Sequence, residues 1–210
     1  MLSLIAVETS DIVGSTKLSR PELNTAITAL KSCIAGISHE SNDIVAEFYR
    51  GDAFQIMYPN AVSSFKNLLI IKLYMLSHLD FTVKITQSLA LGSVSLPVKS
   101  LNDRMDDVFI NSGRQLDILD KGEIGISINS FAGADMLALS FLNRLIEGLS
   151  AKQALVLYWY IKDNYPEHKK IAAKLKMTRQ NVNTHLLRGN ADLIRGFINH
   201  FETVVKGEQK

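Results

Sequence analysis

Strands and helices alternate in a fixed order over the first 91 residues, and this order constrains the fold more than any other feature of the sequence. Short apolar runs have the length of strands, and apolar residues spaced three and four apart mark helices. In chain order the pattern predicts a strand over 2–8, a helix over 22–37, strands over 43–49 and 53–58, a helix over 61–77 and a strand over 81–91. This order predicts an α+β, ferredoxin-like fold, in which the first strand pairs with the central hairpin.

The rest of the chain is predicted to be mainly helical. The pattern indicates, in order, a helix over 107–119, a strand over 123–128 and a helix over 131–147, then four helices between Leu149 and Val205. Pro166 ends the first of these four and opens the next, because proline is accommodated in the first turn of a helix. We therefore expect two domains, a ferredoxin-like domain over residues 1–147 and an all-α domain over residues 148–210.

The segment Glu167–Arg188 carries the most informative motif. It resembles the helix-turn-helix pattern I-A-x-x-L-x-h-S/T-x-x-x-V-x-x-x-L, where h is apolar, through Ile171, Ala172, Leu175, Met177, Thr178, Val182 and Leu186. Thr178 is a suitable N-cap for the second helix. Lys176 departs from the pattern, because this family usually has a turn glycine there. The resemblance implies a DNA-binding domain, and the alternative is a helical hairpin that packs within its own domain.

Charge is divided unevenly between the two predicted domains. Residues 1–147 hold 12 Lys/Arg and 16 Asp/Glu, and residues 148–210 hold 11 and 5, so the net charges are −4 and +6. A basic segment with a helix-turn-helix motif is typical of a protein that binds nucleic acid. We predict that the second helix enters the major groove of double-stranded DNA, with base contacts from Thr178, Arg179, Gln180, Asn183 and Thr184. Phosphate contacts are predicted for Lys169, Lys170, Lys174, Lys176 and Arg188.

Two acidic residues of the N-terminal part are candidates for a metal site. Asp11 follows the first predicted strand, and Asp52 lies in the tight turn Arg50-Gly51-Asp52 of the hairpin that pairs with it. Beside Asp11 lies the polar, glycine-containing loop Gly14-Ser15-Thr16. Carboxylate oxygens and backbone N–H groups are what Mg²⁺ and a polyphosphate require. The alternative is that both aspartates are ordinary turn residues, since aspartate is frequent in turns.

These segments resemble known motifs. Asp11–Thr16, and Gly51-Asp52 before an apolar strand, resemble the two metal-binding motifs of class III nucleotidyl cyclases. A closer resemblance is to the SatD-like proteins, through D-I-V-x-S, the G-D-x-F-Q segment Gly51–Gln55, a loose F-x-x-x-R segment from Phe109 to Arg114 and the C-terminal helix-turn-helix. The resemblance implies Mg²⁺ and a nucleotide, with Asp11 and Asp52 as metal ligands and Gly14, Ser15, Thr16 and Arg114 as nucleotide-binding residues.

One position departs from the cyclase pattern. Cyclases place an asparagine four residues before a transition-state arginine, and if Arg114 is that arginine the position is Ile110. Asn111 is one residue out of register, and no base-reading Lys/Asp pair is evident. Without a charge-stabilising partner, a carboxylate pair binds metal and nucleotide but lacks the electrostatic contribution that usually carries most of catalysis. Binding without turnover, or no ligand at all, is therefore favoured over cyclase activity.

Other features exclude several classes of protein. We expect a cytoplasmic protein, because no N-terminal signal peptide is evident and no apolar run reaches the roughly 18 residues of a membrane span. Cys33 is the only cysteine and lies on an apolar helical face, which favours a buried thiol over a nucleophile. The five histidines have no metal-ligand spacing.

Three functional hypotheses follow from the sequence. The first is a DNA-binding transcriptional regulator whose N-terminal domain forms a homodimer or senses a nucleotide effector. The second is an enzyme, a metal-dependent nucleotidyl cyclase or nucleotide-processing protein whose helical domain serves only for docking. The third is a protein–protein adaptor. Ile110 argues against catalysis, and the basic face of residues 168–188 argues for nucleic acid.

Overall fold

A five-stranded sheet in the order β2-β3-β1-β4-β5 forms the centre of the computed structural model, which describes residues 2–40, 43–49, 51–98, 100–101 and 104–208. The strands are β1 (Leu2–Ile12), β2 (Val45–Tyr49), β3 (Ala53–Tyr58), β4 (Ile85–Ser95) and β5 (Ile124–Ser127). β1 is antiparallel to both β3 and β4, and β5 is parallel to β4. The first four strands have the ferredoxin-like order, so the predicted fold class is confirmed.

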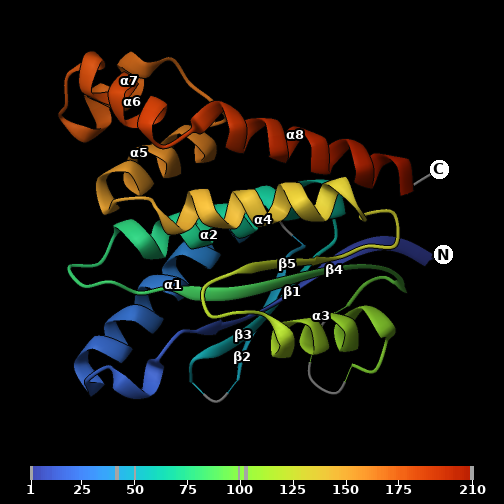
Figure 1. The fold of residues 1–210 in the computed structure, drawn as a ribbon. Helices are drawn as coiled ribbons and strands as arrows, with labels where there is room; N and C mark the ends of the chain where they lie inside the picture. The colour runs from blue at the N-terminus through green and yellow to red at the C-terminus, as the bar shows by residue number, and fades with distance from the viewer. Residues whose placement is uncertain (1, 41–42, 50, 99, 102–103, 209–210) are drawn as a thin grey trace.

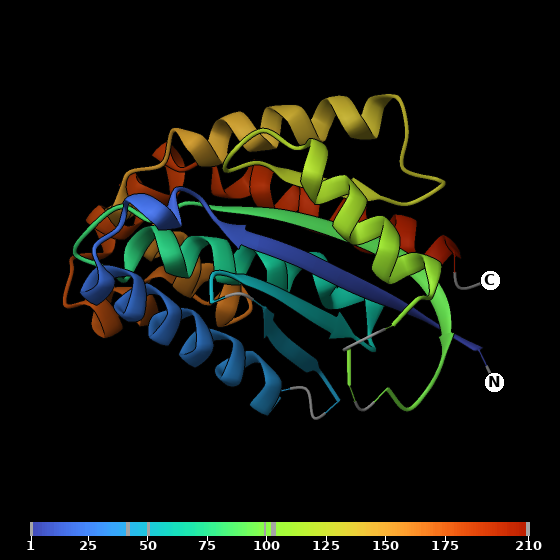
Figure 2. The same cartoon turned by 90° about the horizontal axis from the view of Figure 1, so that it is seen from below.

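Helices cover both faces of the sheet. On one face are α1 (Arg20–Glu40), α2 (Ser64–Ser77) and α4 (Ala134–Glu147), which share a large hydrophobic cluster with the sheet. On the other face α3 (Asp107–Ile118) packs through Val108 and Phe109. Figure 1 shows α2 and α4 above the sheet and α3 below it, and Figure 2 shows the same layers from below. Because both faces are covered, the central strands are apolar on both sides.

Close approach of α3 to the sheet requires a glycine in β4. A Cβ atom added at Gly92 would lie 2.7 Å from the Cβ of Val108, a contact that real side chains do not make. The glycine therefore allows Val108 to enter the cluster formed with Ile5, Val7 and Val94. This contact fixes α3 across the sheet and so decides which face of α3 is exposed.

The first strand is longer than the sequence pattern predicts. The pattern ends it at residue 8 and treats Thr9–Thr16 as a loop, but β1 continues to Ile12, which lies opposite Ile85 of β4. The polar residues Thr9, Ser10 and Asp11 enter the strand because β1 has hydrogen-bonded neighbours on both sides, and this pairing overrides the low strand preference of polar residues. The prediction of a loop over Thr9–Ile12 was therefore wrong.

A buried carboxylate, which was not predicted from the sequence, lies on one face of the sheet. Glu8 is fully buried and accepts hydrogen bonds from the hydroxyl groups of Tyr58 (2.6 Å) and Ser10 (2.9 Å) and from Nε2 of Gln87 (2.8 Å). Burial raises the pKa of Glu8, and these three donors oppose that shift. Nearby, Nζ of the buried Lys72 donates to the carbonyl oxygen of Ile85 at 2.7 Å. The buried acid is tolerated because its oxygens have partners.

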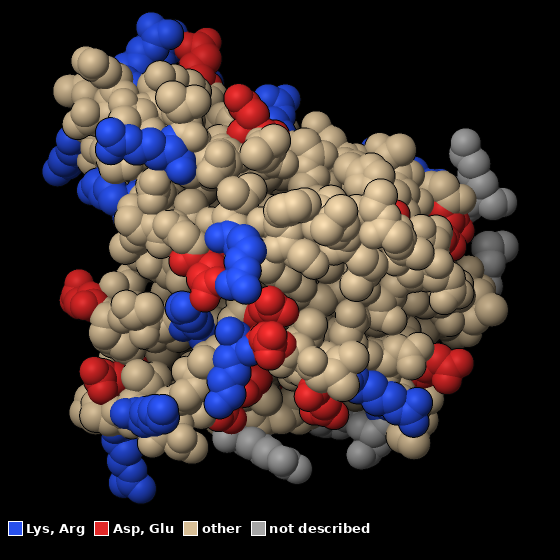
Figure 3. Space-filling model, in the orientation of Figure 1, with Lys and Arg blue, Asp and Glu red and all other residues tan. Residues whose placement is uncertain are grey.

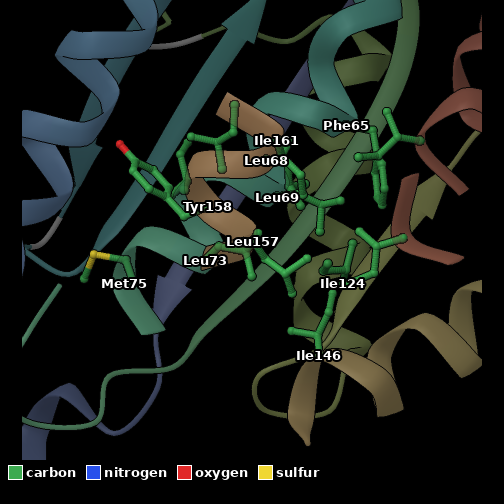
Figure 4. Close-up of a cluster of buried hydrophobic side chains, with 14 of the residues drawn as sticks. Phe65, Leu68, Leu69, Leu73, Met75, Ile124, Ile146, Leu157, Tyr158 and Ile161 are labelled. Atoms are coloured by element: carbon green, nitrogen blue, oxygen red, sulfur yellow. The ribbon is translucent and has the colours of Figure 1, made fainter. Parts of the chain in front are cut away.

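The C-terminal segment is helical and packs on α2. Its helices are α5 (Ala151–Lys162), α6 (His168–Leu175), α7 (Arg179–Arg188) and α8 (Ala191–Glu208). The rings of Phe197 and Phe201 of α8 each lie 5.1 Å from the ring of Phe65 in α2. Figure 4 shows side chains of α2 and α5 in one cluster with Ile124 and Ile146. The domain boundary between residues 147 and 148 stays a prediction, with buried residues from both sides of it in one hydrophobic cluster. Among the described helices none is both long and apolar enough to span a membrane.

Removal of the Tyr58 hydroxyl should destabilise the fold. The substitution Tyr58→Phe takes a hydrogen bond from a buried carboxylate, and bonds to charged groups contribute about 1.5–3 kcal/mol. We expect the free energy of unfolding in urea to fall by about that amount. Tyr74→Phe is the matched control, because among the described residues the Tyr74 hydroxyl makes no hydrogen bond. Equal stability of the two variants would contradict a structural role for the Glu8 network.

Candidate functional site

Asp11 and Asp52 lie at the same end of two neighbouring strands. Asp11 is opposite Ala53 in the β1–β3 ladder, and the N–H of Ile12 donates to the carbonyl oxygen of Asp52 at 3.3 Å. Burial raises the pKa of the Asp11 carboxyl, and the charge of Asp52 raises it further. The structure therefore brings the two predicted metal ligands close enough to influence each other, although their role as ligands stays a prediction.

The loop after β1 is shaped by a glycine. Gly14 has a left-handed backbone conformation, with φ of 67°, which non-glycine residues rarely adopt. A short 3₁₀-helix, η1 (Ser15–Lys17), follows, and the hydroxyl of Ser15 donates to Oδ2 of Asp52 at 2.5 Å. Thr16 is exposed. The loop thus orients one of the two carboxylates. Among the described residues, its N–H groups at Gly14, Ser15 and Thr16 donate no backbone–backbone hydrogen bond.

The donor set suits Mg²⁺ held together with phosphate. Among the described residues no cluster of three or more His, Cys, Asp or Glu side chains can enclose a metal ion. Mg²⁺ is commonly bound through one or two carboxylates, with phosphate oxygens and water completing the octahedron. Asp11 and Asp52 provide two such carboxylates, so the residues present fit Mg²⁺ with a polyphosphate and do not form an all-protein metal cage.

Polar contacts join α3 to the face of the sheet that carries Asp11. Thr9 and Asp11 alternate in β1 and so share a face. The Thr9 hydroxyl lies 2.7 Å from the hydroxyl of Ser112 in α3 and accepts from Nε2 of Gln55 at 2.9 Å. Lys121, in the loop after α3, lowers the pKa of Asp11 by its charge. Lys121 was not predicted as a site residue, because nothing in the local sequence distinguishes it from a surface lysine.

Arg114, the predicted nucleotide-binding arginine, lies on α3 and does not contact the two carboxylates through an ion pair. Arg114 is exposed, two residues beyond Ser112, and makes no ion pair with Asp11 or Asp52. Ile110 is half-buried on the same helix. Asn111 is exposed and lines a separate polar cavity with Asp107 and Asn129, near the start of β1. Within one chain, neither Ile110 nor Asn111 therefore takes the place of the asparagine that cyclases have beside their metal-binding carboxylates. The nucleotide-binding role of Arg114 stays a prediction.

Helices α6 and α7 cover the two helices of the predicted helix-turn-helix motif, and the motif itself stays a prediction. Lys176, at the position of the usual glycine, has a left-handed conformation with φ of 52°. The Thr178 hydroxyl caps α7 by accepting from the N–H of Asn181 at 3.1 Å. Val182 and Leu186 are buried, so Arg179, Gln180 and Asn183 are exposed on the outer side of α7. Thr184 is half-buried, and its hydroxyl donates to the carbonyl oxygen of Gln180 at 3.0 Å.

The basic side chains predicted to bind phosphate differ in whether they already form an ion pair within the protein. Nζ of Lys174 lies 2.5 Å from Oδ2 of Asp163 and 3.7 Å from the ring centre of Trp159. Lys169 pairs with Glu167 at 2.9 Å on the surface. Lys170, Lys176 and Arg188 are exposed and make no ion pair with other described residues. Figure 3 shows Lys and Arg gathered at the end of the molecule that α6 and α7 form. These three side chains are therefore the freest of the predicted set.

Comparisons with known proteins give structural likeness only. No protein-family model matches the chain, and no curated protein matches it. The chain is similar to a dimeric guanylyl cyclase domain of the RhoGC fusion protein from the aquatic fungus Blastocladiella emersonii, with 18% identity and a TM-score of 0.48 over 59% of this chain and 79% of that chain. It is also similar to the adenylyl cyclase CyaB from P. aeruginosa, with 15% identity and a TM-score of 0.49 over 62% and 80%. The fold assignment itself rests on the strand order.

Binding of Mg²⁺ with a nucleotide should weaken as the pH falls toward the pKa of Asp11. That pKa lies above the ordinary value of 3.8, and only the ionised carboxylate can be a ligand. Affinity is therefore full above the raised pKa and lost below it, and binding within this window releases a proton. Titration calorimetry in two buffers of different ionisation enthalpy should detect the released proton in that window and not at pH 8. An affinity independent of pH between 4 and 8 would contradict the assignment.

Proposed function

We propose that the N-terminal part of this protein binds a nucleoside triphosphate with Mg²⁺ at Asp11 and Asp52. The observation that supports this proposal best is the convergence of two carboxylates from adjacent strands, one of them oriented by the Ser15 hydroxyl. Burial and the charge of Asp52 both raise the pKa of Asp11, and a bound metal ion would favour its ionised form and offset both effects. The N–H groups of the Gly14–Thr16 loop would donate to phosphate oxygens.

The proposed outcome is binding with little or no cyclisation. Mg²⁺ would supply charge neutralisation of the phosphates when bound. Catalysis also needs a side chain that stabilises charge in the transition state, and within one chain Arg114 makes no ion pair with either carboxylate. Ile110 offers no hydrogen bond at the position where cyclases have asparagine. The chain therefore holds the nucleotide as a ligand of the domain, which suits a sensor better than an enzyme.

Nucleotide should raise the thermal stability of the protein through the two aspartates. Mg²⁺ with ATP or GTP at a hundredfold excess over the dissociation constant should stabilise the fold by about 2.7 kcal/mol. The double substitution Asp11→Asn with Asp52→Asn should abolish this shift. Asp107→Asn is the control, because this exposed acid lies at the other end of the sheet, beside Leu4 and Ser93. The wild-type protein should yield almost no cyclic nucleotide with Mg²⁺ or Mn²⁺, and rapid production would favour the enzyme hypothesis.

A second function, binding of double-stranded DNA, is proposed for α6 and α7. The specific observation is the outer side of α7, where Arg179, Gln180 and Asn183 are exposed above a capped N-terminus. Forked and amide side chains suit guanine and adenine edges in the major groove. Many helix-turn-helix proteins read two half-sites as dimers, which agrees with the predicted homodimer. Together the two proposals describe a regulator whose DNA affinity depends on nucleotide.

Substitutions on α6 and α7 should separate base reading from phosphate binding. Arg179→Ala and Asn183→Ala should each lower discrimination between selected and random duplexes by about 1–3 kcal/mol. Lys170→Ala should weaken binding to all duplexes alike and reduce the log–log salt slope by about 0.9. Lys206→Ala, near the far end of α8, is the control for loss of one positive charge. Electrophoretic mobility shift at two salt concentrations measures both quantities, and identical behaviour of all four variants would exclude α7 as the recognition helix.

A further inference from the structure

Helix α4 has large apolar side chains on the side that faces away from the sheet. Its inner side is buried through Leu139, Leu142 and Ile146. On the opposite side, Leu137 is 59% exposed and Phe141 is 64% exposed, and residues four apart on a helix are neighbours. Among the described parts of the chain, no other helix or strand has more than one large apolar side chain so exposed. Contiguous apolar patches mark interaction surfaces, whereas single exposed apolar side chains need no explanation.

The outer side of α4 is nearly free of charge. We define the α4 stripe as Leu137, Ser140, Phe141 and Arg144, whose spacing of three and four residues places them along one side of the helix. The Ser140 hydroxyl donates to the carbonyl oxygen of Met136 at 3.0 Å, so it needs no donor partner outside the helix. The charge of Arg144 is balanced by Glu147 at 2.9 Å. Figure 3 shows mainly uncharged surface over the middle of α4, and such a surface suits a neutral, apolar partner rather than nucleic acid.

Large and small residues of the α4 stripe follow each other in a self-complementary order. If a second α4 lies antiparallel, with a two-fold axis between Ser140 and Phe141, Phe141 of each copy lies against Ser140 of the other. Large against small allows the two helices to interdigitate. Leu137 of each copy then lies against the aliphatic stem of Arg144 of the other. The two arginines are at opposite ends of this pair, whereas a parallel pair would place their charges side by side. A closed two-fold dimer requires such a self-complementary patch.

We propose that the α4 stripe is the interface of a two-fold homodimer, covered by the same stripe of a second copy of this chain. Figure 2 shows α4 at the outer edge of the molecule, with nothing of its own chain in front of it. Helix α4 packs on the face of the sheet opposite to the one that carries Asp11, so the dimer leaves the two carboxylates accessible.

The same pairing has a consequence for the helix-turn-helix segment. Figure 1 shows α6 and α7 beyond the C-terminal end of α4, on the side where α8 lies. A two-fold axis that is perpendicular to α4 and points toward α8 keeps α6 and α7 of both copies on one side of the dimer, at its two ends. Two recognition helices on one side are what a pair of half-sites requires.

The experiment measures the dimer dissociation constant of the full chain by sedimentation velocity. The wild-type protein should show a monomer–dimer equilibrium. Phe141→Asp should raise the dissociation constant about a hundredfold or more, because it removes an aromatic anchor from both copies. Ile118→Asp is the matched control, because Ile118 is 83% exposed on α3, on the other face of the sheet. Ser140→Cys tests the antiparallel pairing, since the two new thiols lie beside the two-fold axis and a short bis-maleimide should join them. Cys33 is 5% exposed, so the wild-type protein should not be joined.

Three results would overturn the proposal. A wild-type protein that stays monomeric at all concentrations excludes the dimer, and flotation of that monomer with neutral phosphatidylcholine vesicles would assign the α4 stripe to a membrane surface instead. A dimer that Phe141→Asp and Ile118→Asp leave equally stable forms through another surface. A Ser140→Cys protein that dimerises but is not joined by the bis-maleimide excludes the antiparallel pairing. Circular dichroism of each variant verifies that it is folded before its dissociation constant is interpreted.

Discussion

The pairing of β1 with both β3 and β4 is the constraint on which the rest of the structure depends. Because neighbouring residues of a strand point to opposite faces, the register decides which side chains meet α2 and which meet α3. Glu8 points to the Tyr58 and Gln87 side, and Thr9 points to Ser112. A slip of one residue would place Glu8 against the apolar α3 cluster and Asp11 in the opposite core. The candidate metal site and the buried carboxylate are therefore two results of one register.

The N-terminal fold was predictable because its signal is local and repeated. Each strand and helix has its own apolar period, and the order of these periods alone indicates the ferredoxin-like arrangement confirmed by the strand order. The extension of β1 through Asp11 was not predictable in this way. It depends on hydrogen bonds to residues about 40 and 75 positions later, and no local pattern reports those partners. The same limit explains why Lys121 and the contacts of Lys72 were missed.

The helix-turn-helix segment shows the same division between local and distant causes. Its boundaries follow from contacts within a few residues, namely the Thr178 cap and the left-handed Lys176, and the sequence predicts both positions. The position of the Lys174 ammonium group, by contrast, is set by contacts with Trp159 of α5 and with Asp163, the residue that ends α5. A lysine that must leave an aromatic ring and a carboxylate to reach phosphate contributes less to DNA affinity than a free one. Charge counting over a segment therefore overestimates the number of available phosphate contacts.

The packing of α2 joins the sheet to the C-terminal helical segment. This helix, with the sequence SFKNLLIIKLYMLS, is apolar on nearly every side, which is typical of a helix that is covered all round. The sheet covers one side, and the other side meets α5 and α8 through Tyr74 against Tyr158 and Phe65 against Phe197. Residues 1–147 alone would expose this second side to water, and exposure of apolar area costs about 25 cal/mol per Å². The helical segment is therefore part of what stabilises α2 and, through α2, the sheet.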